Sequence, residues 1–208
     1  MQWFLETSQR ESEKNGRIIV RQEPGYPRVL VDGYSETSIG LNEIWYDALV
    51  RLPVRQAGAQ AHLPEKVANI LILGLGAGGM LKEVYTLFPH CHITAVEHDP
   101  EMVALTKELK LYEPFPLPNI VEEDAGAYVS VARETYDLIA VDLFRGGEPS
   151  PLLLDTDFLY ALQKKMLDDG VLLINVANTE EYLSPAIQHF AHSETWKFRY
   201  NHLGMFWN

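Results

Sequence analysis

The segment Ile70–Val84, ILILGLGAGGMLKEV, decides the fold of this chain. Its apolar start without polar alternation indicates a buried strand, and the apolar spacing after the glycines indicates a helix. The turn between them reads Gly-x-Gly-x-x-Gly at Gly74, Gly76 and Gly79, with an extra glycine at Gly78. In such a turn the first glycine permits a tight bend, the second admits a ligand to the backbone, and the third lets helix pack on strand. A glycine turn at a strand end occurs in many α/β proteins, and here it favours a nucleotide or nucleoside site.

The alternation of buried strand and helix continues to the end of the chain. We expect strands at 67–75, 91–99, 119–124, 136–144 and 170–178, helices at 78–88, 100–111, 155–167 and 180–191, and a closing hairpin at 195–207. Strands that lack polar alternation and are separated by helices predict a parallel sheet covered on both faces. The fold class is therefore α/β, a doubly wound, mostly parallel sheet of seven strands with a Rossmann-like arrangement.

The chain upstream of this pattern predicts a smaller unit. Residues 17–39 contain RIIVRQE and PRVLVDGY on either side of the turn-forming PGYP, which predicts a β-hairpin. A helix is expected at 41–52, and a loose segment at 53–66 separates it from the glycine turn. We therefore divide the chain into an N-terminal β-hairpin and helix, 1–55, and a nucleoside-binding catalytic domain, 56–208.

Composition limits the functional classes. The 208 residues carry a formal net charge of −12, which disfavours a nucleic-acid partner and suits a cationic small molecule as well as an ordinary acidic protein. No apolar run is long enough to span a membrane, and the first residues do not resemble a signal peptide. Cys91 is the only cysteine, so no disulfide forms within the chain and a cytoplasmic location is expected.

Acidic residues stand at the carboxyl ends of three expected strands. Glu97 follows Gly76 by about 20 residues, the spacing at which a carboxylate of nucleotide-binding sheets takes the ribose hydroxyls. Asp124, followed by Ala125, opens DAGAY after the third strand, where a carboxylate is placed to accept the adenine amino group. Asp142 ends the fourth strand, and the switch-point rule directs it into the same crevice.

Each of these acids also has a purely structural interpretation. Glu97 fits a solvated strand end, and an Asp is a common helix cap or turn residue. The glycine turn alone does not exclude a dinucleotide with its pyrophosphate on the helix N-terminus. Acids at successive strand ends favour an adenosyl sulfonium of the S-adenosylmethionine type. His98 lines the adenine edge or faces solvent, and the scattered histidines predict no metal site.

Several segments match one known family in the order of its motifs. Its Gly-Gly-Gly-Asp-Gly-Gly motif is matched by LILGLGAGGMLKEV, and its Val-Glu-Ile-Asp segment by AVEHDPEMVAL. Its Tyr-Asp-x-Ile-x-x-Asp strand is matched by YDLIAVDLF, and its Asp-Gly-x-x-Gln-x-Thr segment by VDGYSETSIGLNEIWYDAL. The later helix and strand are matched by LLLDTDFLYALQKKMLDDGVLLIN, and the closing hairpin by FRYNHLGMFW. From about Pro27 to its end the chain resembles the spermidine/spermine synthase family, in particular its spermidine synthase-like branch.

The resemblance implies a function and a set of roles. It implies aminopropyl transfer to a polyamine amine, with S-adenosylmethionine or its decarboxylated form as co-substrate, no metal, and a homodimer. Asp142 would orient and deprotonate the attacking amine, and Tyr200 would supply a catalytic hydroxyl on the acceptor side. The donor would bind to the glycine turn and to the ends of the next two strands. The residues are Gly74, Gly76, Ala77, Gly78, Glu97, His98, Asp124 and Ala125. Aromatic residues near 45 and 206 fit the subunit interface or the core.

Three departures from the family pattern leave the reaction open. Ala77 stands where the family has Asp beside the donor's amino tail, Arg145 replaces an acceptor-side Asp, and Glu36 replaces Gln; Glu36 and Arg145 would contact the acceptor. An arginine repels a diamine, and the loss of the motif Asp would admit an intact S-adenosylmethionine carboxylate. An S-adenosylmethionine-dependent methyltransferase and a non-catalytic nucleoside-binding protein therefore remain alternatives. A nicotinamide dehydrogenase would leave Asp124, Asp142 and the closing hairpin unexplained.

Overall fold

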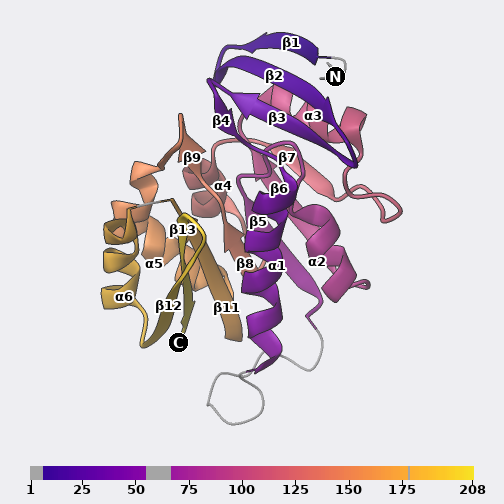
Figure 1. Ribbon diagram of the computed structural model, residues 1–208. Coiled ribbons are helices and arrows are strands. Elements are labelled where there is room, and N and C mark those ends of the chain that lie inside the picture. The colour runs from indigo at the N-terminus through magenta and orange to yellow at the C-terminus, as the bar shows by residue number, and fades with distance from the viewer. Residues whose placement is uncertain (1–6, 55–66, 178) are drawn as a thin grey trace.

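A seven-stranded sheet forms the centre of the molecule in a computed structural model that describes residues 7–54, 67–177 and 179–208 (Figure 1). The strand order is β12-β13-β11-β8-β5-β6-β7. Only β13 runs antiparallel to its neighbours β11 and β12. The strands are β5 (Asn69–Leu73), β6 (His92–Glu97), β7 (Asn119–Glu122), β8 (Tyr136–Val141), β11 (Met166–Val176), β12 (His192–Phe198) and β13 (Asn201–Trp207). The expected fold class is confirmed.

Helices cover both faces of this sheet. They are α1 (Ile39–Val54), α2 (Leu81–Leu87), α3 (Pro100–Leu109), α4 (Ala125–Val131), α5 (Thr156–Lys165) and α6 (Ser184–His189), with short 3-10 helices η2 (Pro151–Leu154) and η3 (Glu180–Leu183). One apolar cluster joins α1 and α2 to the sheet, and a second joins α4, α5 and α6 to it. No helix among the described residues is long and apolar enough to cross a bilayer. Helix α4 was not predicted, because it is short and its apolar residues have no clear helical period.

A four-stranded antiparallel sheet sits above α3 at the top of Figure 1. It consists of β1 (Thr7–Ser12), β2 (Gly16–Glu23), β3 (Tyr26–Val31) and β4 (Tyr34–Ser35). The sequence predicts the central pair, β2 and β3, whereas β1 and β4 lack the alternation that marks a strand. Buried aliphatic side chains of β2 and β3 pack with α3, so the small sheet is fixed over one end of the large one.

The apolar side chains of helix α1 pack with the large sheet. Its buried side chains Trp45, Ala48 and Leu49 belong to the same apolar cluster as Ile70 and Ile72 of β5. We therefore propose a structural boundary between β4 and α1, upstream of the division at residue 55. The expected loose segment lies almost wholly outside the described residues.

Candidate active site

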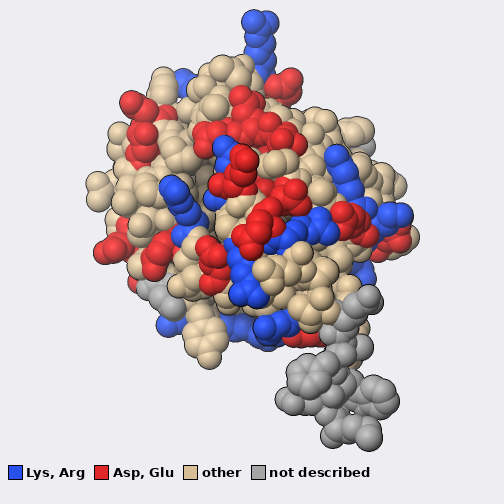
Figure 2. All heavy atoms as spheres, turned by 90° about the horizontal axis from the view of Figure 1, so that it is seen from above, with Lys and Arg blue, Asp and Glu red and all other residues tan. Residues whose placement is uncertain are grey.

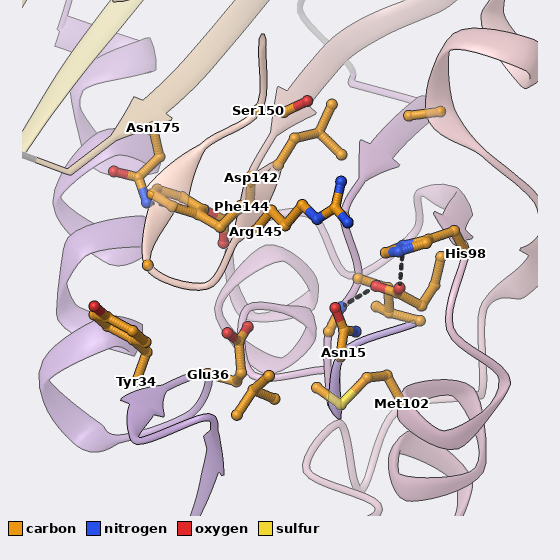
Figure 3. Close-up of a pocket in the computed structure, with 18 of the residues that line it drawn as sticks. Asn15, Tyr34, Glu36, His98, Met102, Asp142, Phe144, Arg145, Ser150 and Asn175 are labelled. Atoms are coloured by element: carbon orange, nitrogen blue, oxygen red, sulfur yellow. Dashed lines mark hydrogen bonds and ion pairs between the residues drawn. The ribbon is translucent and has the colours of Figure 1, made fainter. Parts of the chain in front are cut away.

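A cavity of about 620 Å³ opens at the carboxyl edge of the large sheet, under the small sheet (Figure 3). The ends of strands β5, β6, β8 and β11 form its floor. The β1–β2 turn, the end of β3, strand β4 and helix α1 contribute to its walls. Acidic side chains outnumber Lys14 and Arg145 among the described residues that line it. The acidic ones are Glu13, Glu36, Glu97, Glu123, Asp124 and Asp142. Figure 2 looks down on this end of the molecule, where acidic side chains gather across the middle of the face with basic ones among them. The negative balance favours a cationic ligand.

The glycine turn lies on the floor of the cavity. Gly74 has φ +85°, and a Cβ there would come within 2.2 Å of the Asp142 carbonyl oxygen. Gly76 has φ +55°, and its N–H donates to Glu97 Oε2 at 2.8 Å. Both glycines line the cavity, as predicted, whereas Gly78 is buried against Thr106. The turn therefore exposes Gly74 and Gly76 to a ligand and uses Gly78 to pack against α3.

Glu97 is held in place by backbone donors. It is almost fully buried and accepts the N–H of Gly76 on Oε2 and the N–H of Asp99 on Oε1, at 2.8 and 3.0 Å. His98 Nδ1 lies 3.2 Å from the same Oε1, and the hydrogen bond with Glu97 raises the pKa of His98. Glu97 thus connects the glycine turn to the end of β6 and lines the cavity with oxygens that have further lone pairs.

Asp124 and Ala125 line the cavity where β7 gives way to α4. Asp124 is the N-cap of α4, and its Oδ1 accepts the N–H of Ala127 at 2.9 Å. The helix-cap interpretation of Asp124 is therefore confirmed, and its exposed position on the cavity wall leaves its second oxygen available to a ligand.

Asp142 stands at the end of β8 with both carboxylate oxygens held. Trp45 Nε1 donates to Oδ2 at 3.0 Å, and Asn175 Nδ2 donates to Oδ1 at 2.8 Å. Asn201 Nδ2 in turn donates to Asn175 Oδ1 at 2.9 Å, so the amide of Asn175 is oriented as well. Burial raises the pKa of Asp142 to about 6, although both of its hydrogen bonds act in the opposite direction. A carboxylate fixed in this way is suited to accept a proton near neutral pH.

Glu36 and Arg145, the two expected acceptor-side residues, both line the cavity. Glu36 is half-buried after β4 and points into the cavity in Figure 3. Burial, together with the negative charges of Asp142 and Glu97, raises the pKa of Glu36 to about 7. Arg145 is exposed on the short hairpin of β9 (Phe144–Arg145) and β10 (Glu148–Pro149). Its side chain extends across the cavity in the same view.

Besides Gly78, two expected site residues do not face the cavity. Tyr200 lies in the turn between β12 and β13 with 79% of its surface exposed, while its neighbour Asn201 lines the cavity. Ala77 is 1% exposed and packs in an apolar cluster with Val29 of β3 and Leu105 of α3, because the small sheet covers that side of the glycine turn. A catalytic role for Tyr200 and a donor-tail role for Ala77 are therefore not retained.

Three residues of the Asp142 network were not predicted from the sequence. Trp45 comes from α1, Asn175 from β11 and Asn201 from β13, and each partner is distant along the chain. Of the three, only Asn175 has a signal in the sequence, because it is a polar residue at the end of an apolar strand. Among the described residues no group of three or more His, Cys, Asp or Glu is arranged to hold a metal ion.

The fold and the cavity define a class of protein: a Rossmann-like sheet with an acidic, nucleoside-sized site at its switch point. A family model described as "Spermine/spermidine synthase domain" matches residues 56–194. The chain belongs to this family. A polyamine aminopropyltransferase of Pseudomonas syringae pv. tomato is 28% identical over 163 residues, covering 75% of this chain and 54% of that protein. The chain thus spans about half the length of the curated relatives it matches.

Solved structures agree on the fold. A probable spermidine synthase from Corynebacterium glutamicum superposes with a TM-score of 0.75 at 18% identity, covering 96% of this chain and 79% of that one. A spermidine synthase in complex with the transition-state analogue AdoDATO gives 0.72 at 16% identity, covering 96% and 71%. Human methyltransferase-like protein 13, in complex with SAH, gives 0.64 at 21% identity, covering 82% of each chain. The sheet is thus shared with both aminopropyl and methyl transferases.

Proposed function

We propose that this chain is an aminopropyltransferase that uses decarboxylated S-adenosylmethionine as donor and an amine of the polyamine class as acceptor. Family membership and the similarity to polyamine aminopropyltransferases support the reaction class. The observation that carries the proposal is Asp142, a carboxylate held on both oxygens inside an acidic cavity beside the glycine turn. That arrangement suits an acceptor of the polyamine class, which carries positive charge, and a sulfonium donor better than any anionic ligand.

In this proposal the adenosine of the donor lies across Gly74 and Gly76. Glu97 accepts hydrogen bonds from the ribose hydroxyls, and Asp124 accepts one from the adenine amino group. Both carboxylates line the cavity, and both retain lone pairs beyond their hydrogen bonds to the chain. The sulfonium then faces the interior of the cavity, toward Asp142.

The reaction is an in-line displacement at carbon. The amine lone pair forms a bond to the methylene carbon attached to the sulfonium, the C–S bond breaks, and its electron pair stays on sulfur. Neutral methylthioadenosine leaves. The attacking nitrogen loses one proton, which Asp142 accepts and passes to solvent. A free alkyl amine has a pKa near 10, so the attacking amine must be bound in its neutral form, and Asp142 takes up the proton that this nitrogen loses as the C–N bond forms.

The raised pKa of Asp142 predicts a dependence on pH. A base must be deprotonated to act, so kcat measured with both substrates saturating should fall as the pH drops through about 6. Asp142→Asn should lower kcat by about 10²–10⁴-fold, because the amide accepts no proton. Methylthioadenosine release, measured by chromatography with a series of linear diamines, tests both statements. Calorimetry should show that the variant still binds methylthioadenosine. A variant that turns over at the wild-type rate would remove Asp142 from the mechanism.

A methyltransferase is the second candidate, and Arg145 is the observation in its favour. Its guanidinium lines the cavity and forms no ion pair with the described residues, so it is available to an intact S-adenosylmethionine carboxylate. The donor that is turned over decides between the aminopropyltransferase and the methyltransferase.

We also propose a cytoplasmic location, which the single cysteine, Cys91, supports.

A further inference from the structure

Glu36 is a carboxylate in the cavity that has no side-chain partner among the described residues. Its backbone N–H is bound to the Val29 carbonyl, and the next residue, Thr37, is fully buried and bonded to β3 through its hydroxyl. The loop after β4 is therefore fixed, and it directs the Glu36 side chain into the cavity (Figure 3). Within the described part of the chain no side chain donates a hydrogen bond to this carboxylate, and no basic side chain forms an ion pair with it.

The charges that act on Glu36 are both negative, from Asp142 on β8 and Glu97 on β6. The basic groups that line the same cavity, Lys14 of the β1–β2 turn and Arg145 of β9, form no ion pair with it, and His98 contacts Glu97 instead. Three carboxylates that face one space repel one another unless a cation lies between them. Within the described part of the chain Glu36 therefore has no positive partner, and a cationic ligand is suited to supply one.

The position of Glu36 shows which part of a ligand it would meet. Its Oε2 lies 3.8 Å from the place a Cβ would occupy at Gly76, with Met102 Cε 3.9 Å from the same point. Gly76 donates its N–H to Glu97, the ribose acceptor, and the negative charges of both Glu97 and Asp142, the base, act on Glu36. Glu36 thus lies near both the ribose end and the reacting end of the site, and the chain attached to the sulfonium must run between these two ends.

We propose that Glu36 forms the subsite for the ammonium group at the end of the donor's aminopropyl tail, and that its charge excludes the carboxylate of intact S-adenosylmethionine. This assignment rests on the proposed function. The two donors differ only in a carboxylate on the carbon that bears this ammonium. A negative residue there attracts one donor and repels the added charge of the other. The side chain of Ala77 is only a methyl group, and it packs in an apolar cluster. Selectivity between the two donors therefore depends on Glu36.

The test is calorimetric titration of wild type and Glu36→Gln with methylthioadenosine, decarboxylated S-adenosylmethionine and S-adenosylmethionine. Glutamine keeps the shape and removes the charge. We expect the variant to bind the decarboxylated donor about ten- to a hundredfold more weakly and methylthioadenosine within about twofold of wild type. The preference for the decarboxylated donor should shrink at least about tenfold. Glu11→Gln removes an exposed carboxylate of β1 that does not line the cavity, and should change none of these affinities.

A proton count gives a second, independent signal. Because the pKa of Glu36 is raised to about 7, part of the Glu36 side chains carry a proton near neutral pH in the free protein, and binding of an ammonium there should release it. Titration in buffers of different ionisation enthalpy measures this release. We expect it with the decarboxylated donor, not with methylthioadenosine, and to a smaller extent in Glu36→Gln.

Three outcomes would overturn the assignment of Glu36. They are an unchanged affinity of the variant for the decarboxylated donor, an equal loss for methylthioadenosine, and an effect confined to the KM of the acceptor amine. Failure of wild type to bind methylthioadenosine at all would instead refute the proposed function, so the two failures are distinguishable.

Discussion

The two acids at the cavity floor, Asp142 and Glu97, are held by different kinds of donor. Asp142 is bound by two side chains, whereas Glu97 accepts one backbone N–H on each oxygen. Glu97 therefore fixes the conformation of the Gly76 turn while it faces the ligand. Because backbone donors cannot rotate away, a substitution at Glu97 changes the turn and the ligand contact together.

Glu97→Gln tests this double role. An amide has only one acceptor oxygen, so its NH₂ must oppose the N–H of Gly76 or of Asp99. We expect methylthioadenosine to bind about 1.5–3 kcal/mol more weakly, about ten- to a hundredfold, by calorimetry. Glu122→Gln, at the paired position of β7 and outside the cavity, is the matched control. Equal affinities in both variants would contradict the assignment of Glu97.

The individual site residues could be predicted where they follow directly from strand ends. Gly74, Gly76, Glu97 and Asp142 are adjacent in the sequence to the expected ends of buried strands, and the parallel topology brings those ends to one edge. The partners of Asp142 were not predicted because they come from elements that meet only in the folded chain. The direction of Ala77 depends on the small sheet above it, which no local pattern reveals.

At the scale of elements, the junction between the small sheet and α3 depends on Asp99. This residue is fully buried, and its Oδ2 accepts hydrogen bonds from Ser12 Oγ and Asn15 Nδ2 at 2.6 and 2.7 Å. Its Oδ1 caps α3 by accepting the N–H of Glu101 at 2.8 Å. One carboxylate thus starts a helix of the large domain and anchors the β1–β2 turn, which forms part of the cavity wall.

Asp99→Ala should destabilise the protein more than loss of a cap alone. It leaves the donors of Ser12 and Asn15 without a partner and removes the cap, so we expect a loss of about 2–4 kcal/mol of unfolding free energy. Asp155→Ala removes the exposed cap of α5 and should cost about 0.5–2 kcal/mol. Urea denaturation of both variants measures the difference. Equal losses would show that the junction contributes nothing.

Most strands of the large sheet can be predicted from the local sequence pattern, whereas strand β1 of the small sheet cannot. Apolar runs bounded by glycine or acidic residues marked β5, β6, β8 and β11 correctly. Strand β1 is built from TSQRES, whose side chains are mostly exposed, and it forms because β2 supplies a full set of pairing partners. Pairing of this kind depends on tertiary contacts that a single segment does not encode.

At the scale of the whole molecule, the homodimer implied by the family stays a prediction. Trp45 and Phe206 are buried in the core, so they are not available to an interface. Tyr46 on α1 remains 46% exposed and is a candidate contact. Light scattering should give twice the chain mass of 23.6 kDa, and Tyr46→Glu should lower it, whereas Ile187→Glu on α6 should not. A monomer at micromolar concentration in wild type would refute the dimer.

The central claim is that the acidic cavity transfers an aminopropyl group and not a methyl group. The direct measurement is a competition in which wild-type protein receives equal amounts of S-adenosylmethionine and its decarboxylated form with a linear diamine. Mass spectrometry then identifies the products. The account predicts an aminopropylated amine together with an equal amount of methylthioadenosine, and at least about a hundredfold slower formation of both in Asp142→Asn. A methylated amine together with S-adenosylhomocysteine would contradict it and would assign Arg145 to the intact donor.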